Sequence, residues 1–211
     1  MKTVNISGVN IDIHSDKPVG ISVSGGADSA VLLYILLQQV TQPVHIYTFL
    51  GQLKRAIAEP VVDRVIAKCV ELTGNSNIVH HKEYIDVQTP ALIYGIMGDR
   101  IKAGEVDIIY TGMTKFPPDD VINTFNEKLE NWLYENRKAS EERPLYFGND
   151  SFYRPFMNLD KKDISKLYSS LDLLESLYPI TRSCESELSP DRHCGKCFWC
   201  EERRWGFGYL E

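Results

Sequence analysis

Apolar and polar residues alternate in blocks along the first half of the chain. Four short apolar runs have the length and composition of buried strands. They cover residues 19–24, 43–50, 77–85 and 106–112. Three longer segments between these runs predict helices, the first of them with a broad apolar face. They cover residues 27–40, 58–74 and 91–104. Strands that alternate with helices predict right-handed crossovers. We therefore expect an α/β fold with an open, twisted parallel sheet and helices on both faces.

The pattern changes after residue 112. A proline-containing loop, "MTKFPPDD", leads into an amphipathic segment over 120–140 that predicts a helix. An irregular, aromatic-rich segment covers 141–158, and a further helix is expected over 159–171. We divide the chain accordingly into an α/β core, residues 1–112, and a small helical C-terminal part, residues 113–211.

Composition narrows the class of protein. The chain has 211 residues, of which 43% are hydrophobic and 25% charged, as in ordinary globular proteins. The formal net charge of −6 argues against bulk binding to a nucleic-acid backbone. No apolar stretch reaches membrane-spanning length, and the segment "MKTVNISGVNIDIHSDK" lacks the apolar core of a signal peptide. We therefore expect a cytoplasmic protein that does not bind membranes.

The most informative short segment is "SGGADS", residues 24–29, between a predicted strand and a predicted helix. Gly25 and Gly26 allow a sharp turn, and the helix start presents free backbone N–H groups. With the hydroxyls of Ser24 and Ser29, this arrangement predicts a phosphate cradle at the carboxyl edge of the sheet. Asp28 would repel phosphates unless it holds Mg²⁺. The alternative is an ordinary turn in which a serine or aspartate caps the helix.

Four of the five cysteines lie close together near the C-terminus. Cys184, Cys194, Cys197 and Cys200 form a C-x9-C-x2-C-x2-C pattern, which predicts a structural, tetrahedral zinc site. An iron–sulfur cluster, two disulfides, or a site in which His193 replaces one thiolate remain alternatives. The fifth cysteine, Cys69, lies on the apolar face of a predicted helix, and we expect it to be a small core residue.

Several other residues allow two interpretations, one structural and one functional. His80 and His81 end a predicted strand, where a partly buried strand histidine is favoured over a metal site. Phe147, Phe152, Tyr153 and Phe156 either stack on a planar heterocycle or pack a loop over the core. The segment "EERR", residues 201–204, is expected to be a solvated helix end, with Arg203 and Arg204 as alternative contacts for a substrate carboxylate.

"SGGADS" resembles the signature of the PP-loop ATP pyrophosphatases, whose fold is that of the adenine nucleotide alpha hydrolases. Members of that family cleave ATP between the α- and β-phosphates and attach AMP to a substrate oxygen, which a nucleophile then displaces. The resemblance implies ATP and Mg²⁺ as cofactors and a set of nucleotide-binding residues. These are Val23, Ser24, Gly25, Gly26, Asp28, Ser29, Gln52, Thr111 and Gly112.

Further segments resemble the 7-cyano-7-deazaguanine synthase (QueC) family. They are "FLGQ", "EPVVDRVIAKCVELTG", "IYTGM", "RPFMNLDKKDI" and "SCESELSPDRHCGKCFWCEERRWGF". This resemblance makes Lys161 the family lysine and implies Asp28, Ser24 and Lys161 as catalytic residues, with Zn²⁺ on the four cysteines. It also implies a small heterocyclic carboxylate and ammonia as partners, with AMP as leaving group, and queuosine-type deazapurine biosynthesis as the pathway class. We also expect that a compact domain of this kind can form a homodimer.

Two stretches depart from the QueC pattern. "DVQTPALIYGI" lacks the family's Gly-Arg-Asn, and "MTKFPPDD" lacks its Cys-Arg. Both stretches line the acceptor pocket in the family, so the acceptor is left open. The alternatives are a PP-loop enzyme that modifies tRNA or conjugates another acceptor, and a non-catalytic, zinc-stabilised binding module.

Overall fold

The computed structural model describes most of the chain. The described residues are 1–52, 55–86, 89–126, 137, 145–146, 149–184, 186 and 189–210.

A six-stranded sheet forms the centre of the fold, in the strand order β5-β4-β3-β6-β8-β7. Five strands are parallel, and the two-residue strand β7 pairs antiparallel at one edge. Their bounds are β3 Val19–Ser22, β4 Val44–Gly51, β5 Ile78–Ile85, β6 Ile108–Thr111, β7 Leu145–Tyr146 and β8 Asn149–Tyr153. The predicted open parallel sheet is confirmed.

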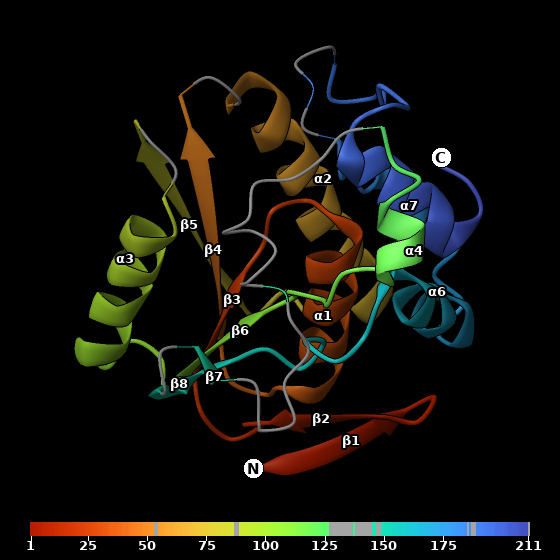
Figure 1. Cartoon of the computed structure of the whole chain (residues 1–211). Helices are drawn as coiled ribbons and strands as arrows, with labels where there is room; N and C mark the ends of the chain where they lie inside the picture. The colour runs from red at the N-terminus through yellow and green to blue at the C-terminus, as the bar shows by residue number, and fades with distance from the viewer. Residues whose placement is uncertain are drawn as a thin grey trace.

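Helices cover both faces of this sheet, as expected (Figure 1). Helix α3, Pro90–Lys102, lies on one face, and helices α1, Ala27–Gln39, and α2, Arg55–Thr73, lie on the other. Helix α1 is buried around most of its circumference, because it lies between the sheet, α2 and the C-terminal helices. The continuous apolar run "AVLLYILL" suits that position.

The C-terminal part consists of helices α4 (Asp119–Ile122), α6 (Lys161–Ser170) and α7 (Phe198–Phe207), with a short 3₁₀ helix, η1 (Tyr178–Ile180). Gly206 of α7 sits directly on α6, where a Cβ would approach the Lys161 Cβ to 2.3 Å. The two helices therefore pack closer than any side chain at this position would allow.

The helix predicted over 120–140 is wrong for residues 123–126, because α4 ends at Ile122. Phe125 instead turns into a cluster with Phe116 and Phe198, and the Asn126 amide donates to Glu201 at 2.6 Å. Burial of this aromatic ring against α7 outweighs continuation of the helix. Residues 127–136 and 138–140 of this prediction lie outside the described residues, as does most of the segment 141–148.

An N-terminal hairpin, β1 Lys2–Ile6 and β2 Val9–Ile13, packs beneath the sheet (Figure 1). Ser7 and Gly8 both have positive φ, which suits the tight turn between two antiparallel strands. Ile11 and Ile13 are fully buried, so the hairpin closes the bottom of the core. The sequence analysis did not predict it.

The division near residue 113 stays a prediction. Residues from both sides of it share one core, in which Leu167 and Tyr168 of α6 pack with α1 and α2. Strand β8 also joins the same sheet as β6. Among the helices that the structure describes, none combines the length and apolar character needed to cross a membrane.

Candidate nucleotide site and thiolate cluster

The loop between β3 and α1 requires glycine at Gly25. Its φ of +83° lies in the left-handed region, and a Cβ there would approach Val61 Cγ1 of α2 to 2.8 Å. The backbone is tied from the other side, since the Arg182 N–H donates to the Gly25 carbonyl at 2.9 Å. Backbone chirality and close packing by α2 together determine the shape of the loop.

Two serines organise the interior of this loop. The Ser29 hydroxyl accepts from the Ser24 N–H at 3.3 Å and donates to the Gly26 carbonyl at 3.2 Å. The Ser24 hydroxyl accepts from the Gly26 N–H at 3.4 Å. The N-cap of α1 is Gly26, and no side chain of the described residues caps the helix. The first turn of α1 therefore directs N–H donors at the space above the loop, as an anion site requires.

Thr111 and Gly112, at the end of β6, close the loop from the neighbouring strand. A Cβ on Gly112 would lie 2.7 Å from the Ser29 nitrogen and 2.8 Å from the Asp28 carbonyl carbon. Only glycine leaves room for this approach. Two buried oxygens here, Asp28 Oδ1 and Thr111 Oγ1, have no hydrogen-bond partner among the described residues. Such orphan oxygens fit a site that takes a hydrated cation or a ligand donor.

Behind the loop lies a network of buried charges. Lys161 Nζ, at the start of α6, pairs with Asp28 Oδ2 and lies 3.8 Å from Glu202 Oε2. Glu202 accepts at 2.5 Å from Arg137, whose guanidinium also donates to the Thr114 carbonyl at 2.7 Å. The Lys161 side chain is 7% exposed and Glu202 is fully buried. The network fixes Asp28 and places a cation next to the glycine loop.

These groups line one side of a cavity of about 520 Å³. Six of the nine residues expected at the nucleotide line it, together with Lys161, which was expected as a catalytic residue. The six are Ser24, Gly26, Asp28, Ser29, Thr111 and Gly112. Val23 and Gly25 are buried and do not line the cavity. Gln52 is exposed and does not line it either. Apolar side chains of α3, Ile93 and Tyr94, also line the cavity, and Trp199 lines it beside Arg137.

The sequence analysis missed Arg137, Glu202 and Thr114. Arg137 falls in a segment expected to be an amphipathic helix, and nothing in its neighbourhood marks it as buried. The expectation that "EERR" is a solvated helix end is wrong for Glu202 and Arg203, which are both buried. Arg203 donates to the Leu210 and Tyr178 carbonyls at 2.7 and 3.0 Å and stacks on the Tyr178 ring. It therefore holds the C-terminal segment together, while Arg204 is exposed.

The aromatic residues considered as stacking partners belong to the core. Phe152, Tyr153 and Phe156 are all buried, and the residues lining the cavity do not include them. Phe147 lies outside the described residues. Cys69 is also in the core, where burial raises the pKa of its thiol to about 12.

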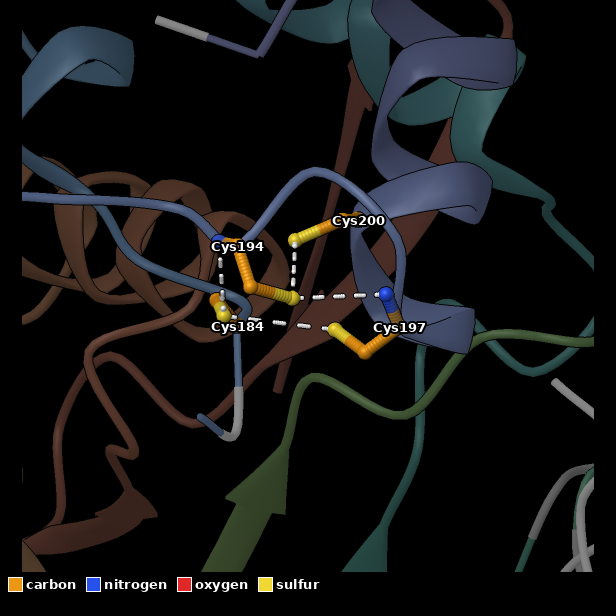
Figure 2. Close-up of side chains that lie close together, drawn as sticks. All are labelled: Cys184, Cys194, Cys197 and Cys200. Atoms are coloured by element: carbon orange, nitrogen blue, oxygen red, sulfur yellow. Dashed lines mark hydrogen bonds between the residues drawn. The ribbon is translucent and has the colours of Figure 1, made fainter. Parts of the chain in front are cut away.

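The four C-terminal cysteines converge on one point (Figure 2). Their sulfurs all lie within 4.8 Å of one another, and the Cys194–Cys200 and Cys184–Cys197 sulfur pairs are each 3.9 Å apart. Sulfurs on one tetrahedral zinc are about 3.8 Å apart, given Zn–S bonds of about 2.3 Å. The donor set thus fits a single bound metal ion.

The backbone around the cluster supports thiolates. The Cys194 N–H donates to Cys184 Sγ and the Cys197 N–H to Cys194 Sγ, each at 3.3 Å (Figure 2). Gly195 takes a φ of +74°, which allows the tight turn before α7. None of the five cysteines, all within the described residues, forms a disulfide. The converging group consists of the four cysteines and does not include His193.

Comparisons with known proteins divide the chain into two stretches. Residues 7–111 match the asparagine synthase family model, and residues 120–211 match the model of queuosine biosynthesis protein QueC. A search of the curated proteins found no match.

The solved structures that this chain resembles include a tRNA thiolase and an NAD synthetase. The U34-tRNA thiolase NcsA from Methanococcus maripaludis, with its [4Fe-4S] cluster, is 16% identical over 92% of this chain and 71% of its own, with a TM-score of 0.46. The NH3-dependent NAD synthetase from Campylobacter jejuni is 15% identical over 78% of this chain and 68% of its own, with a TM-score of 0.42.

Each of the two family models covers residues that line the same cavity. The first covers the glycine loop and the closing Thr111–Gly112 pair, and the second covers Lys161 and the four cysteines. The chain belongs to the PP-loop ATP pyrophosphatase superfamily of ATP-using enzymes and, within it, resembles QueC.

Proposed function

We propose that this chain is an AMP-forming ligase that adenylates the carboxylate of a small heterocyclic substrate, which ammonia then attacks. 7-Carboxy-7-deazaguanine or a close relative is the proposed carboxylate. The observation that carries the proposal is the junction of three elements at one cavity: the "SGGADS" loop, the Thr111–Gly112 strand end, and the buried Lys161.

The nucleotide half follows from charge and donors. The backbone N–H groups at the start of α1, with Ser24 and Ser29, are suited to hold the pyrophosphate of ATP. Asp28 is the residue placed to hold Mg²⁺, which would neutralise phosphate charge when bound. Lys161 lies beside Asp28, so its ammonium is positioned to offset the negative charge that grows on the leaving pyrophosphate.

The proposed chemistry balances in two displacements. A substrate carboxylate oxygen bonds to the α-phosphorus of ATP, and the bond to the β-phosphate oxygen breaks to release pyrophosphate. Ammonia then attacks the acyl carbon, AMP leaves with its bonding electron pair, and the nitrogen loses a proton to give the amide. A second adenylation, on the amide oxygen, would release a second pyrophosphate. AMP would then leave with that oxygen while the nitrogen gives up its two protons, which leaves a nitrile.

The cavity supports a small acceptor. Its volume of about 520 Å³ falls within the usual range for small-molecule sites. Tyr94 and Trp199, which both line the cavity, suit a flat, aromatic substrate. The acidic balance of the chain gives no support to a large nucleic-acid acceptor.

For the thiolate cluster we propose structural Zn²⁺. The sulfurs lie within 4.8 Å of one another, which suits four bonds to one ion. In an iron–sulfur cubane each cysteine binds a different iron, so its thiolates stand further apart. Because all four donors are protein thiolates, the site has no open position, and its role is to join the 182–197 segment to α7.

The test is mass spectrometry of the base product. Purified protein is incubated with ATP, Mg²⁺, ammonium and 7-carboxy-7-deazaguanine, and the amide and nitrile are sought by mass. Either product supports the proposal, and ¹⁵N-ammonium should appear in it. An unchanged base, from protein that still cleaves ATP when another carboxylate is supplied, would contradict the acceptor.

A further inference from the structure

A second group of metal-binding side chains lies on the other face of the sheet from the nucleotide loop's helix. His45 of β4, His81 of β5 and Glu105, shortly before β6, bring their ligand atoms within 4.8 Å of one another. They lie under α3, since Arg100 of that helix bonds Glu105. None of them lines the large cavity or belongs to the thiolate cluster.

The two imidazoles face each other through nitrogen. His45 Nδ1 and His81 Nε2 are 3.1 Å apart. Two nitrogens bound to one tetrahedral metal lie about 3.3 Å apart, because metal–nitrogen bonds are about 2.0–2.1 Å. This spacing lets both ring nitrogens bind one ion.

Glu105 is held for a third bond. Its Oε1 accepts from Arg100 at 2.9 Å, while its Oε2 is buried and has no hydrogen-bond partner among the described residues. Arg100 also donates to Glu83 at 2.9 Å, so two carboxylates share one guanidinium and leave a surplus of negative charge. Buried polar atoms rarely lack a partner, and a bound ion is one recognised explanation.

The neighbouring Tyr47 provides a second buried polar atom of the same kind. Its ring stacks on His81 at 4.9 Å, and its buried hydroxyl also lacks a partner among the described residues.

We propose that His45, His81 and Glu105 form a second metal site that binds a divalent first-row transition ion of the Zn²⁺ or Co²⁺ class. Two imidazoles and one carboxylate select such ions over Mg²⁺ and Ca²⁺, which prefer oxygen donors. Three protein ligands leave a position for water, unlike the closed thiolate cluster. The site is independent of the proposed ligase reaction. The competing explanation is a simple hydrogen bond between the two rings.

The test uses Co²⁺ as a spectroscopic probe on zinc-loaded protein. The protein is first loaded with one equivalent of Zn²⁺ per chain, which goes to the four soft thiolates, and any more weakly bound zinc is stripped with a chelator. Co²⁺ is then added in steps, and the number of cobalt and zinc ions bound per chain is measured by elemental mass spectrometry. We expect one cobalt per chain, with visible d–d bands and without the intense ultraviolet thiolate-to-cobalt bands. His81→Gln and Glu105→Gln should each weaken cobalt binding at least about tenfold, the lower range for loss of even an outer-shell contact.

His80→Gln is the matched control. His80 immediately precedes His81 in β5 but faces the opposite side of the sheet, where its Nε2 lies 3.0 Å from Thr48 Oγ1. This variant should bind cobalt as the parent does. Glu105→Gln keeps the oxygen that bonds Arg100, so it decides the matter if the histidine variant misfolds, as judged by circular dichroism. The proposal fails if no cobalt binds, if thiolate bands appear, if neither variant weakens binding, or if His80→Gln weakens it equally.

Discussion

Replacement of Lys161 by methionine should destabilise the protein through the charge that it leaves behind. The Lys161 side chain is 7% exposed and Asp28 is 17% exposed, so Asp28 would keep its charge with neither a partner nor full hydration. Removing one member of a buried pair typically costs about 3–5 kcal/mol. For a chain of this length that corresponds to a fall in Tm of about 6–20 °C. Glu202 retains Arg137 at 2.5 Å, so it adds little to the loss.

A double-mutant cycle isolates this effect. Urea unfolding followed by circular dichroism gives the free energy of unfolding for Lys161→Met, Asp28→Asn and the double variant. The double variant should be more stable than the sum of the single effects by about 1–3 kcal/mol, because the neutral pair needs no compensation. Lys162→Met, at an exposed position, is the control and should cost less than about 1 kcal/mol. Additive single effects, or equal losses for Lys161→Met and Lys162→Met, would rule out an unpaired buried charge as the cause.

Three further predictions concern the loop, the metal and the pH response. Gly112→Ala places a Cβ 2.7 Å from the Ser29 nitrogen and should lower ATP turnover about 10²-fold, whereas Gly98→Ala, with no atom within 4 Å, should leave it unchanged in the same assay. Cys197→Ser should lower the zinc content, measured by elemental mass spectrometry, by the one ion of the thiolate cluster, and should lower Tm; an unchanged zinc content would contradict this. Burial lowers the pKa of His80. The unfolded chain therefore binds more protons than the folded one as the pH falls through about 6.5. Unfolding free energy should thus drop between pH 7.5 and 5.5, by less in His80→Gln; equal drops would contradict it.

Features that depend on neighbouring residues could be predicted from the sequence. The turn between β3 and α1 needs glycines and serines within a few positions, so "SGGADS" carries its own geometry. The closely spaced Cys194, Cys197 and Cys200 likewise indicate a metal-binding turn. The apolar runs of the parallel strands are readable because both faces of such strands are buried.

Features that depend on contacts between distant segments could not be predicted. Lys161 follows Asp28 by 133 positions, and Glu202 follows Arg137 by 65, yet each pair is joined in the folded chain. The QueC resemblance singles out Lys161, but the residues around it mark only an ordinary helix start, and Glu202 stands in a run of charges. Their burial arises only when α6 and α7 pack on α1, and Gly206, which permits that packing, carries no distinctive local pattern.

The convergence of His45, His81 and Glu105 under α3 could not be predicted for the same reason. His81 is one of two adjacent strand histidines, and a strand places adjacent side chains on opposite faces. The sequence does not say which of them meets His45, since this depends on the register between β4 and β5. In the structure Tyr47 pairs with His81, which brings His81 to the face that His45 shares.

The nucleotide products test the central claim most directly. ³¹P NMR of the protein with ATP, Mg²⁺, ammonium and 7-carboxy-7-deazaguanine should show AMP and pyrophosphate in equal amounts, and Asp28→Asn should abolish both. ADP and phosphate as products, or intact ATP with folded, metal-loaded protein, would contradict the account of this loop as an AMP-forming site.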